Sequence, residues 1–111
     1  MEKFYTKELV HRYFYSWQKR DFKTFRDSLS NNVEFDFNGN KITGADSIVE
    51  LAKNGLKWNK VDLLDSIFYK DKSALIYDGI TEKGDKVRVG EIISISNGLI
   101  VKVVAAIVGE A

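Results

Sequence analysis

The second half of the chain most constrains what it can fold into, because four strand-like runs follow one another there with only short turns between them. The expected strands are residues 61–70, 73–82, 86–97 and 99–108. The turns between them are Asp71-Lys72, Gly84-Asp85 and Asn97-Gly98. Connections this short cannot contain a crossover helix, so the four strands should form an antiparallel meander.

The first third of the chain shows helical spacing instead. Val10, Tyr13, Phe14 and Trp17 recur at intervals of three and four residues, which makes one face of a long first helix apolar and aromatic. Thr6 precedes this stripe and is a residue type that favours the N-cap position. We therefore place the start of the first helix at Thr6.

Two shorter helices and one further strand complete the first half. Asp21 can cap a short second helix, and a third helix is expected over residues 45–53. The expected buried stripe of the third helix is Ile48, Leu51 and Ala52. Residues 33–37 alternate strictly and predict a strand whose core-facing positions are Val33, Phe35 and Phe37. This order of elements predicts an α+β domain in which a curved antiparallel sheet wraps around the first helix.

The composition narrows the classes of function. A chain of 111 residues has room for one domain, over 1–111. Its 17 basic and 16 acidic residues are interleaved and give a net charge of +1, so we expect no nucleic-acid partner. The absence of cysteine and the single histidine exclude Cys-based and multi-histidine metal sites, so we expect no metal. No run resembles a signal peptide or a membrane span, so the expected location is cytoplasmic.

Four stretches of the sequence, in this order, resemble the nuclear-transport-factor-like superfamily, which includes the SnoaL-like polyketide cyclases and ketosteroid isomerase. They are LVHRY at 9–13 with RDF at 20–22, LSNNVEF at 29–35, ITGADSI at 42–48 and ISISNGLI at 93–100. The resemblance covers nearly the whole chain. It implies a cone-shaped pocket closed by the first helix and a homodimer. It implies no single activity, because isomerases, cyclases, dehydratases, epoxide hydrolases and binding domains share the fold.

The resemblance also suggests roles for individual residues. The isomerase tyrosine that donates to an oxyanion corresponds to Tyr13, and its protonated aspartate corresponds to Glu91 or Ile93. Its general-base aspartate corresponds to Phe37, which cannot act as a base. The neighbouring Asp36 should point to the opposite face of the strand, unless a one-residue bulge turns it inward. Steroid-type isomerisation is therefore not favoured.

Independently of the resemblance, the residue pattern makes Glu91 the strongest candidate for a catalytic residue. In the run 86–97 it alternates with Val87, Val89, Ile93 and Ile95, so it lies in the middle of an apolar face. A carboxyl group there must be desolvated, and desolvation raises its pKa toward values useful for a general acid or base. The alternative is a glutamate at the mouth of the pocket that is paired with a lysine or reaches water.

Asp78 is a second candidate, in the run 73–82. Either Asp78 or Tyr77 should face the pocket, and the sequence leaves open which of them does. If Asp78 and Glu91 both face inward, two carboxyl groups share one cavity and their pKa values are pushed apart. The alternative is that one of the two lies outside.

The remaining pocket wall is expected to be aromatic and apolar. The expected ligand-lining residues are Trp17, Phe35, Phe37 and Ile93. His11 lies off the apolar stripe of the first helix and is expected on its side, near solvent or an interface. Trp58 could cover the mouth of the cone or contact a partner chain. The run 99–108 is apolar on both faces apart from Lys102, so we expect a homodimer through this face of the sheet.

These features favour a small-molecule-binding SnoaL-like domain. As an enzyme it would be a cofactor-free acid/base isomerase, cyclase or lyase acting on an apolar substrate. Glu91 or Asp78 would move the proton, and Tyr13 would stabilise the developing negative charge. The alternative is a non-catalytic homodimeric module that binds a ligand or a protein, with a pocket that aromatic side chains fill.

Overall fold

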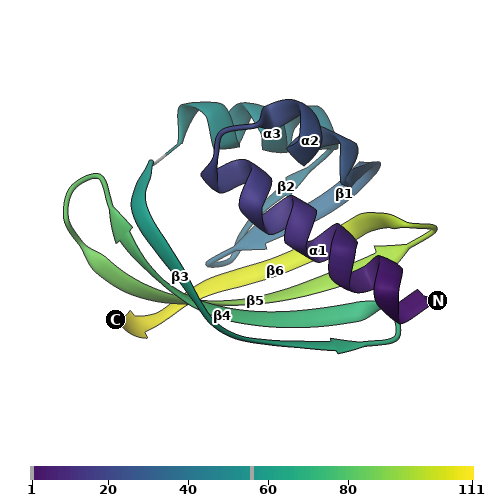
Figure 1. The fold of residues 1–111 in the computed structure, drawn as a ribbon. Helices are drawn as coiled ribbons and strands as arrows, with labels where there is room; N and C mark the ends of the chain where they lie inside the picture. The colour runs from purple at the N-terminus through teal and green to yellow at the C-terminus, as the bar shows by residue number, and fades with distance from the viewer. Residues whose placement is uncertain (1, 56) are drawn as a thin grey trace.

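The computed structural model describes residues 2–55 and 57–111, with side chains from Thr6 onward. Three helices and six strands lie in this described part, and Figure 1 shows their arrangement. In chain order they are α1 (Glu2–Gln18), α2 (Phe22–Asp27), β1 (Leu29–Phe37), β2 (Asn40–Thr43), α3 (Ala45–Asn54), β3 (Trp58–Tyr69), β4 (Lys72–Thr81), β5 (Lys86–Ser96) and β6 (Leu99–Glu110). The predicted α+β class is confirmed.

The strands form one sheet in the order β2-β1-β6-β5-β4-β3. The last four strands pair antiparallel with their neighbours in sequence, as their short turns predicted. One pairing departs from the wholly antiparallel sheet that we expected, because β1 runs parallel to β6, with Phe35 opposite Val103. The long connection from β1 to β6 runs through α3 and the meander, so no turn dictates their relative direction. The sheet is therefore mixed.

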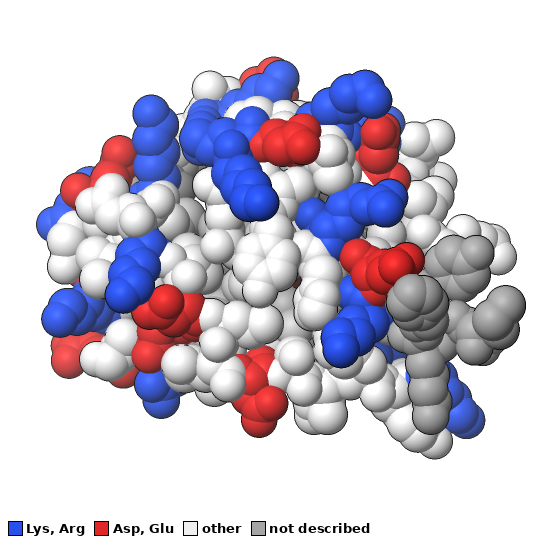
Figure 2. All heavy atoms as spheres, viewed as in Figure 1, with Lys and Arg blue, Asp and Glu red and all other residues white. Residues whose placement is uncertain are grey.

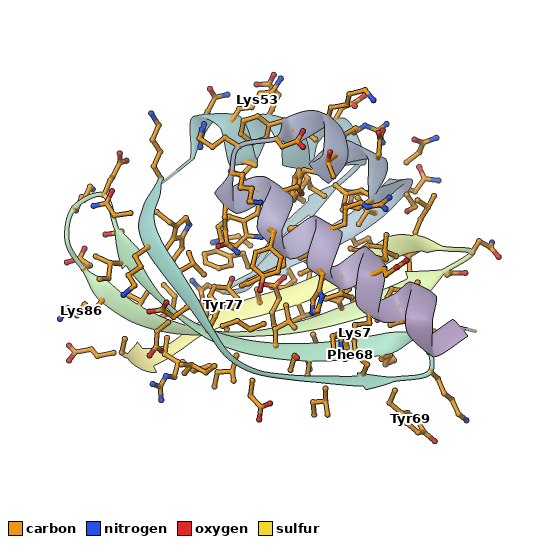
Figure 3. All side chains as sticks on the ribbon, viewed as in Figure 1. Lys7, Lys53, Phe68, Tyr69, Tyr77 and Lys86 are labelled. Carbon is orange, nitrogen blue, oxygen red and sulfur yellow. The ribbon has the colours of Figure 1, made fainter. Side chains whose placement is uncertain are left out.

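The sheet curves around α1, and α2 and α3 lie beyond one end of that helix (Figure 1). The core lies between α1 and the concave face of the sheet. Phe14 and Val10 of α1 are fully buried there, as are Ile93 and Val89 of β5. The pleat of the strands sends successive side chains to opposite faces. In Figure 3, for example, Phe68 lies beneath α1, whereas the next residue, Tyr69, points away from the sheet.

Two hairpins turn at Asn-Gly pairs. Asn97 and Gly98 have φ angles of 53° and 75°, and this left-handed pair connects β5 to β6. Asn38 and Gly39, with φ angles of 52° and 87°, connect β1 to β2 in the same way. Strand β2 has only four residues, too few to show an alternation in the sequence. The sequence therefore indicated the turn but not the strand that follows it.

Two helices, α1 and α3, differ from what their local sequence predicted. The first helix begins at Glu2 rather than at Thr6, which lies buried inside the helix. Its hydroxyl donates a hydrogen bond of 3.0 Å to the Lys70 carbonyl and so ties α1 to the β3–β4 turn. In α3 the predicted stripe is only partly correct. Ile48 is buried, but Leu51 is 48% exposed because the neighbouring elements cover only one side of this helix.

The convex face of the sheet has no helix over it in Figure 1. Cross-strand register places Ile67, Ala74, Ile92 and Val104 in one row across four strands on this face. Three of the four are exposed, and Ile92 is 52% exposed. None of the helices in the described part of the chain is long and apolar enough to span a membrane.

Candidate functional site

Glu91 lies on the concave face of the sheet, as its alternation predicted. It is in the middle of β5, opposite Leu75 of β4 and Ala105 of β6, and both neighbours are buried. Only 4% of Glu91 is exposed. The carboxyl group is therefore held inside the core rather than at its edge.

Two tyrosines bind this carboxyl group, one oxygen each. The hydroxyl of Tyr13 in α1 donates to Oε1 of Glu91 at 2.5 Å, and the hydroxyl of Tyr77 in β4 donates to Oε2 at 2.8 Å. Tyr77 lies between the sheet and α1 in Figure 3. Both tyrosines are buried. We call Tyr13, Glu91 and Tyr77 the Tyr–Glu–Tyr cluster; it joins a helix to two neighbouring strands.

Burial controls the protonation of the cluster. Burial raises the pKa of the Glu91 carboxyl above its ordinary value of 4.5, and the two phenol hydrogen bonds oppose this only in part. Burial, followed by the nearby Glu91 charge, also raises the pKa of Tyr13 and of Tyr77 well above the ordinary value of 10.0. Both phenols therefore keep their protons at neutral pH. No lysine, arginine or histidine in the described part of the chain forms an ion pair with Glu91.

Aromatic rings surround the cluster. Tyr13 stacks on Phe25 with ring centroids 5.7 Å apart, and it meets Phe35 edge-on at 6.3 Å. Tyr77 contacts Phe14 at 5.0 Å and Trp17 at 6.2 Å. These rings shield the carboxyl group from water, which is the physical cause of its raised pKa.

The expected ligand-lining residues have different environments. Ile93 is fully buried, and Phe35 and Trp17 are half-buried within the aromatic layer. Phe37 is paired with Ala105, which is paired with Glu91, so it is on the inward row as expected. It is nevertheless 37% exposed, at the last residue of β1. The predicted inward direction of Phe37 is therefore correct, but its side chain is not buried.

Asp36 does not supply the missing base. It is paired with Val104, one of the exposed residues of the convex row. Its Oδ1 accepts a hydrogen bond of 2.9 Å from the Gly39 backbone N–H. Asp36 therefore stabilises the β1–β2 turn.

Asp78 is the clearest correction. It lies on the convex face, because its neighbour Tyr77 occupies the inward position of β4. Arg88 of β5 donates two hydrogen bonds to it, of 2.7 and 2.9 Å, and these lower the pKa of the Asp78 carboxyl. The hypothesis of two carboxyl groups sharing one cavity is therefore wrong, and Tyr77 takes the place that Asp78 was expected to fill.

The cluster is closed in this conformation. A hollow of about 920 Å³ opens at the other end of α1, between Arg12 and the β3–β4 and β5–β6 turns. None of the three residues of the Tyr–Glu–Tyr cluster lines it. A molecule that reaches Glu91 must therefore displace a side chain that now covers it.

Trp58 and His11, whose roles the sequence left open, take different positions. His11 is half-buried and meets Phe68 and Tyr15 edge-on at 5.9 and 6.0 Å, on the side of α1. Trp58 packs against Trp17, with ring centroids 6.3 Å apart, on the concave face of β4. Trp58 therefore belongs to the aromatic layer, and His11 lies outside the cluster.

Sequence reasoning missed the role of Gly79. A Cβ atom at this position would overlap Cζ3 and Cε3 of the Trp58 indole. The alternation of Ser73, Leu75, Tyr77, Gly79 and Thr81 could have indicated a bare position on an otherwise filled inward row. Only the structure shows which ring lies on it.

No family model matches this sequence, and no curated protein matches it. Solved structures do share its fold. A candidate ketosteroid isomerase from Kribbella flavida superposes with a TM-score of 0.90 at 16% identity, over 100% of this chain and 82% of that one. An NTF2-like protein of unknown function from Burkholderia xenovorans gives 0.89 at 15%, over 100% and 88%. An LEH-like epoxide hydrolase of Mycobacterium tuberculosis gives 0.86 at 14%, over 96% and 85%. At these identities the likeness shows the fold alone.

Proposed function

We propose that this domain, which has the NTF2-like fold, binds a small and mainly apolar molecule beside the Tyr–Glu–Tyr cluster. The cluster would provide the polar contacts for a ligand whose other contacts are apolar. The observation that carries the proposal is the carboxyl group of Glu91, 4% exposed, with a phenol on each oxygen.

Such a carboxyl group is costly for a domain that needs only a packed core. Its neighbours Leu75 and Ala105 are apolar, and a leucine or methionine at position 91 would avoid the desolvation of an acid. Buried titratable groups with a shifted pKa are concentrated at functional sites. A ligand-binding role accounts for the acid, whereas packing alone does not.

The cluster supports cofactor-free acid/base chemistry in particular. Protonated Glu91 can give its proton to a substrate oxygen, and the ionised form can take one back. Either phenol can donate to an oxygen on which negative charge develops. Isomerisation, cyclisation and elimination each require proton transfer and stabilisation of a developing negative charge. We propose that any reaction catalysed by this domain is one of these three.

The test compares the wild-type protein with Glu91→Gln, which keeps the shape of the side chain and removes the acid. A panel of small phenols, cyclic ketones and aliphatic alcohols is screened by ligand-observed NMR, and Tyr13→Phe is measured in parallel. We expect phenols or ketones to bind the wild type and to lose about ten-fold in affinity in Glu91→Gln. Equal binding by the two proteins would show that the acid does not contact the ligand. Asp78→Asn is the matched control, because this acid lies on the other face.

The second candidate function is a homodimeric binding module without catalysis. Two observations favour it: aromatic rings fill the interior, and the convex face exposes apolar side chains from neighbouring strands. Ile92 is paired with Val104 of β6 on this face, and Val108 of β6 lies beside Gly90 two residues earlier in β5. We propose that a second copy of the chain covers this face, because the row from Ile67 to Val104 is apolar across four strands and meets a charged residue only at Asp36 of β1.

Light scattering after size-exclusion chromatography tests the dimer. We expect the wild type to elute as a dimer and Ile92→Glu to elute as a folded monomer. Leu51→Glu, which places the same charge on an equally exposed residue of α3, is the control and should leave the dimer intact. A wild-type monomer at high concentration would contradict the proposal.

A further inference from the structure

We infer that the Trp58 indole occupies the place of the ligand, and that a flat apolar molecule of similar size binds on Gly79 when Trp58 moves away. This inference rests on the proposed function and adds to it the shape of the ligand and the residue that controls access.

Gly79 provides a bare surface on the concave face of the sheet. The other inward positions of β4 carry side chains, among them Tyr77 and Thr81. At Gly79 the six-membered ring of the Trp58 indole comes so close to the backbone that there is no room for a Cβ atom. The backbone at Gly79 has an ordinary negative φ, so its conformation does not require glycine. Close contact with a flat ring is therefore the reason for glycine here.

The surroundings of this surface suit a flat molecule with one polar end. Trp17 forms the apolar wall opposite β4, with its ring 6.3 Å from that of Trp58. Tyr77 precedes Gly79 by two residues, so it faces the same side of the sheet, and its hydroxyl is bonded to Glu91. A molecule on Gly79 would thus have aromatic and aliphatic contacts along its body and a phenol of the cluster at one end.

Trp58 is also placed where it can move. It is the first residue of β3, and β3 is the strand at the edge of the sheet. The register of β3 against β4 shifts between Trp58 and Lys60, so Trp58 is separated from the regular part of the ladder. Strand ends at a sheet edge open at a lower free-energy cost than the centre of a sheet. Displacement of Trp58 therefore requires no rearrangement of the central strands.

The ligand class follows from these contacts. It is a planar, uncharged, fused-ring or similarly flat compound, of about the size of an indole, with a single hydroxyl or carbonyl oxygen at one end. A charged compound would lose its hydration among these aromatic rings, and a bulky aliphatic compound has no flat face to lie on the backbone at Gly79.

The experiment uses 2-naphthol as the probe and isothermal titration calorimetry to measure its affinity. Trp58→Ala vacates the surface, so we expect it to bind 2-naphthol at least about ten-fold more tightly than the wild type. Adding Gly79→Ala to this variant places a methyl group on the surface and should reverse the gain. Adding Gly90→Ala instead is the matched control, because a Cβ there lies 3.6 Å from Val108 in ordinary contact on the convex face.

Two results would overturn the inference. One is a folded Trp58→Ala protein that binds 2-naphthol no better than the wild type. The other is a set of intermolecular NOEs that places 2-naphthol away from Trp17 and Tyr77, for example in the hollow beside Arg12. If Trp58→Ala fails to fold, Trp58→Leu vacates part of the surface and is held to the same criteria.

These outcomes separate the inference from the proposed function. Binding on Gly79 that Glu91→Gln does not weaken would support the place of the ligand and refute the role of the acid. Binding that Glu91→Gln weakens, with NOEs to other residues, would refute the place alone.

Discussion

Replacing Glu91 by glutamine should change how the stability of the domain depends on pH. A glutamine amide has an acceptor oxygen and an NH2 donor group, so like a protonated carboxyl group it can accept from one phenol and donate to the other, and it mimics the neutral acid. The two phenols, Tyr13 and Tyr77, can then keep one hydrogen bond each, one of them by accepting instead of donating. Glu91→Gln therefore removes the titration while it preserves the contacts.

The sign of the effect follows from the raised pKa of Glu91. Well below pH 4.5 the carboxyl group is protonated in both the folded and the unfolded chain, and it adds no pH dependence. As the pH rises above that value, the unfolded chain loses the proton first. The folded chain keeps it until the pH passes the raised pKa, so the stabilising contribution of the neutral acid is lost over this window.

The size of the pH dependence is set by the single proton of Glu91, which the folded chain keeps and the unfolded chain loses. While the unfolded chain is ionised and the folded chain is not, the free energy of unfolding of the wild type falls relative to Glu91→Gln by about 1.4 kcal/mol per pH unit. In acid the two proteins should differ by no more than about 1.5 kcal/mol, which is the scale of one altered hydrogen bond. Other titrating groups are common to both proteins and cancel in the difference.

The assay is urea denaturation of both proteins at intervals of about half a pH unit between about pH 3 and pH 8, followed by tyrosine and tryptophan fluorescence. We expect the difference curve to be flat in acid and then to fall. A difference that stays constant, or one that rises with pH, would refute the reasoning. A rise would mean that the two phenols stabilise the carboxylate more than burial destabilises it.

Three further expectations concern neighbouring residues. Tyr13→Phe and Tyr77→Phe should each lower the free energy of unfolding, measured by urea denaturation, by about 1–3 kcal/mol. The double variant should lose less than the sum of the two, because both phenols bind the same carboxyl group. Additive losses would mean that the two phenols act independently. Gly79→Ala should lower the free energy of unfolding by about 1–3 kcal/mol, because the new methyl group displaces the Trp58 indole. Gly90→Ala should change it by less than about 1 kcal/mol. Similar values for the two variants would contradict the packing at Gly79. Asp78→Asn should leave ligand affinity unchanged in the NMR screen, and a loss equal to that of Glu91→Gln would place Asp78 in the site after all.

Much of the fold could be predicted because it is encoded locally. The Asn97-Gly98 pair adopts the left-handed backbone that a tight hairpin requires, and the short turns leave consecutive strands no choice but to pair antiparallel. The inward position of Glu91 also follows from local alternation, since the residues two places before and after it are apolar. Local rules were sufficient for these features.

The remaining features depend on contacts between distant segments. Asp78 and Tyr77 are adjacent, and both faces of their strand carry polar and apolar residues, so alternation could not choose between them. The choice is made where Leu75 pairs with Glu91 and where Tyr77 meets α1. The parallel pairing of β1 with β6 likewise has no local signal, because more than sixty residues separate Phe35 from Val103.

The central claim is that Glu91 is a buried acid with a raised pKa and that a ligand contacts it. The most direct test follows the carboxyl carbon of Glu91 by ¹³C NMR, assigned by its absence in Glu91→Gln, as the pH is raised with and without 2-naphthol. We expect its titration midpoint to lie above 4.5 in the free protein and its resonance to move when 2-naphthol binds. A midpoint at or below 4.5, together with a resonance that 2-naphthol leaves in place, would contradict the claim.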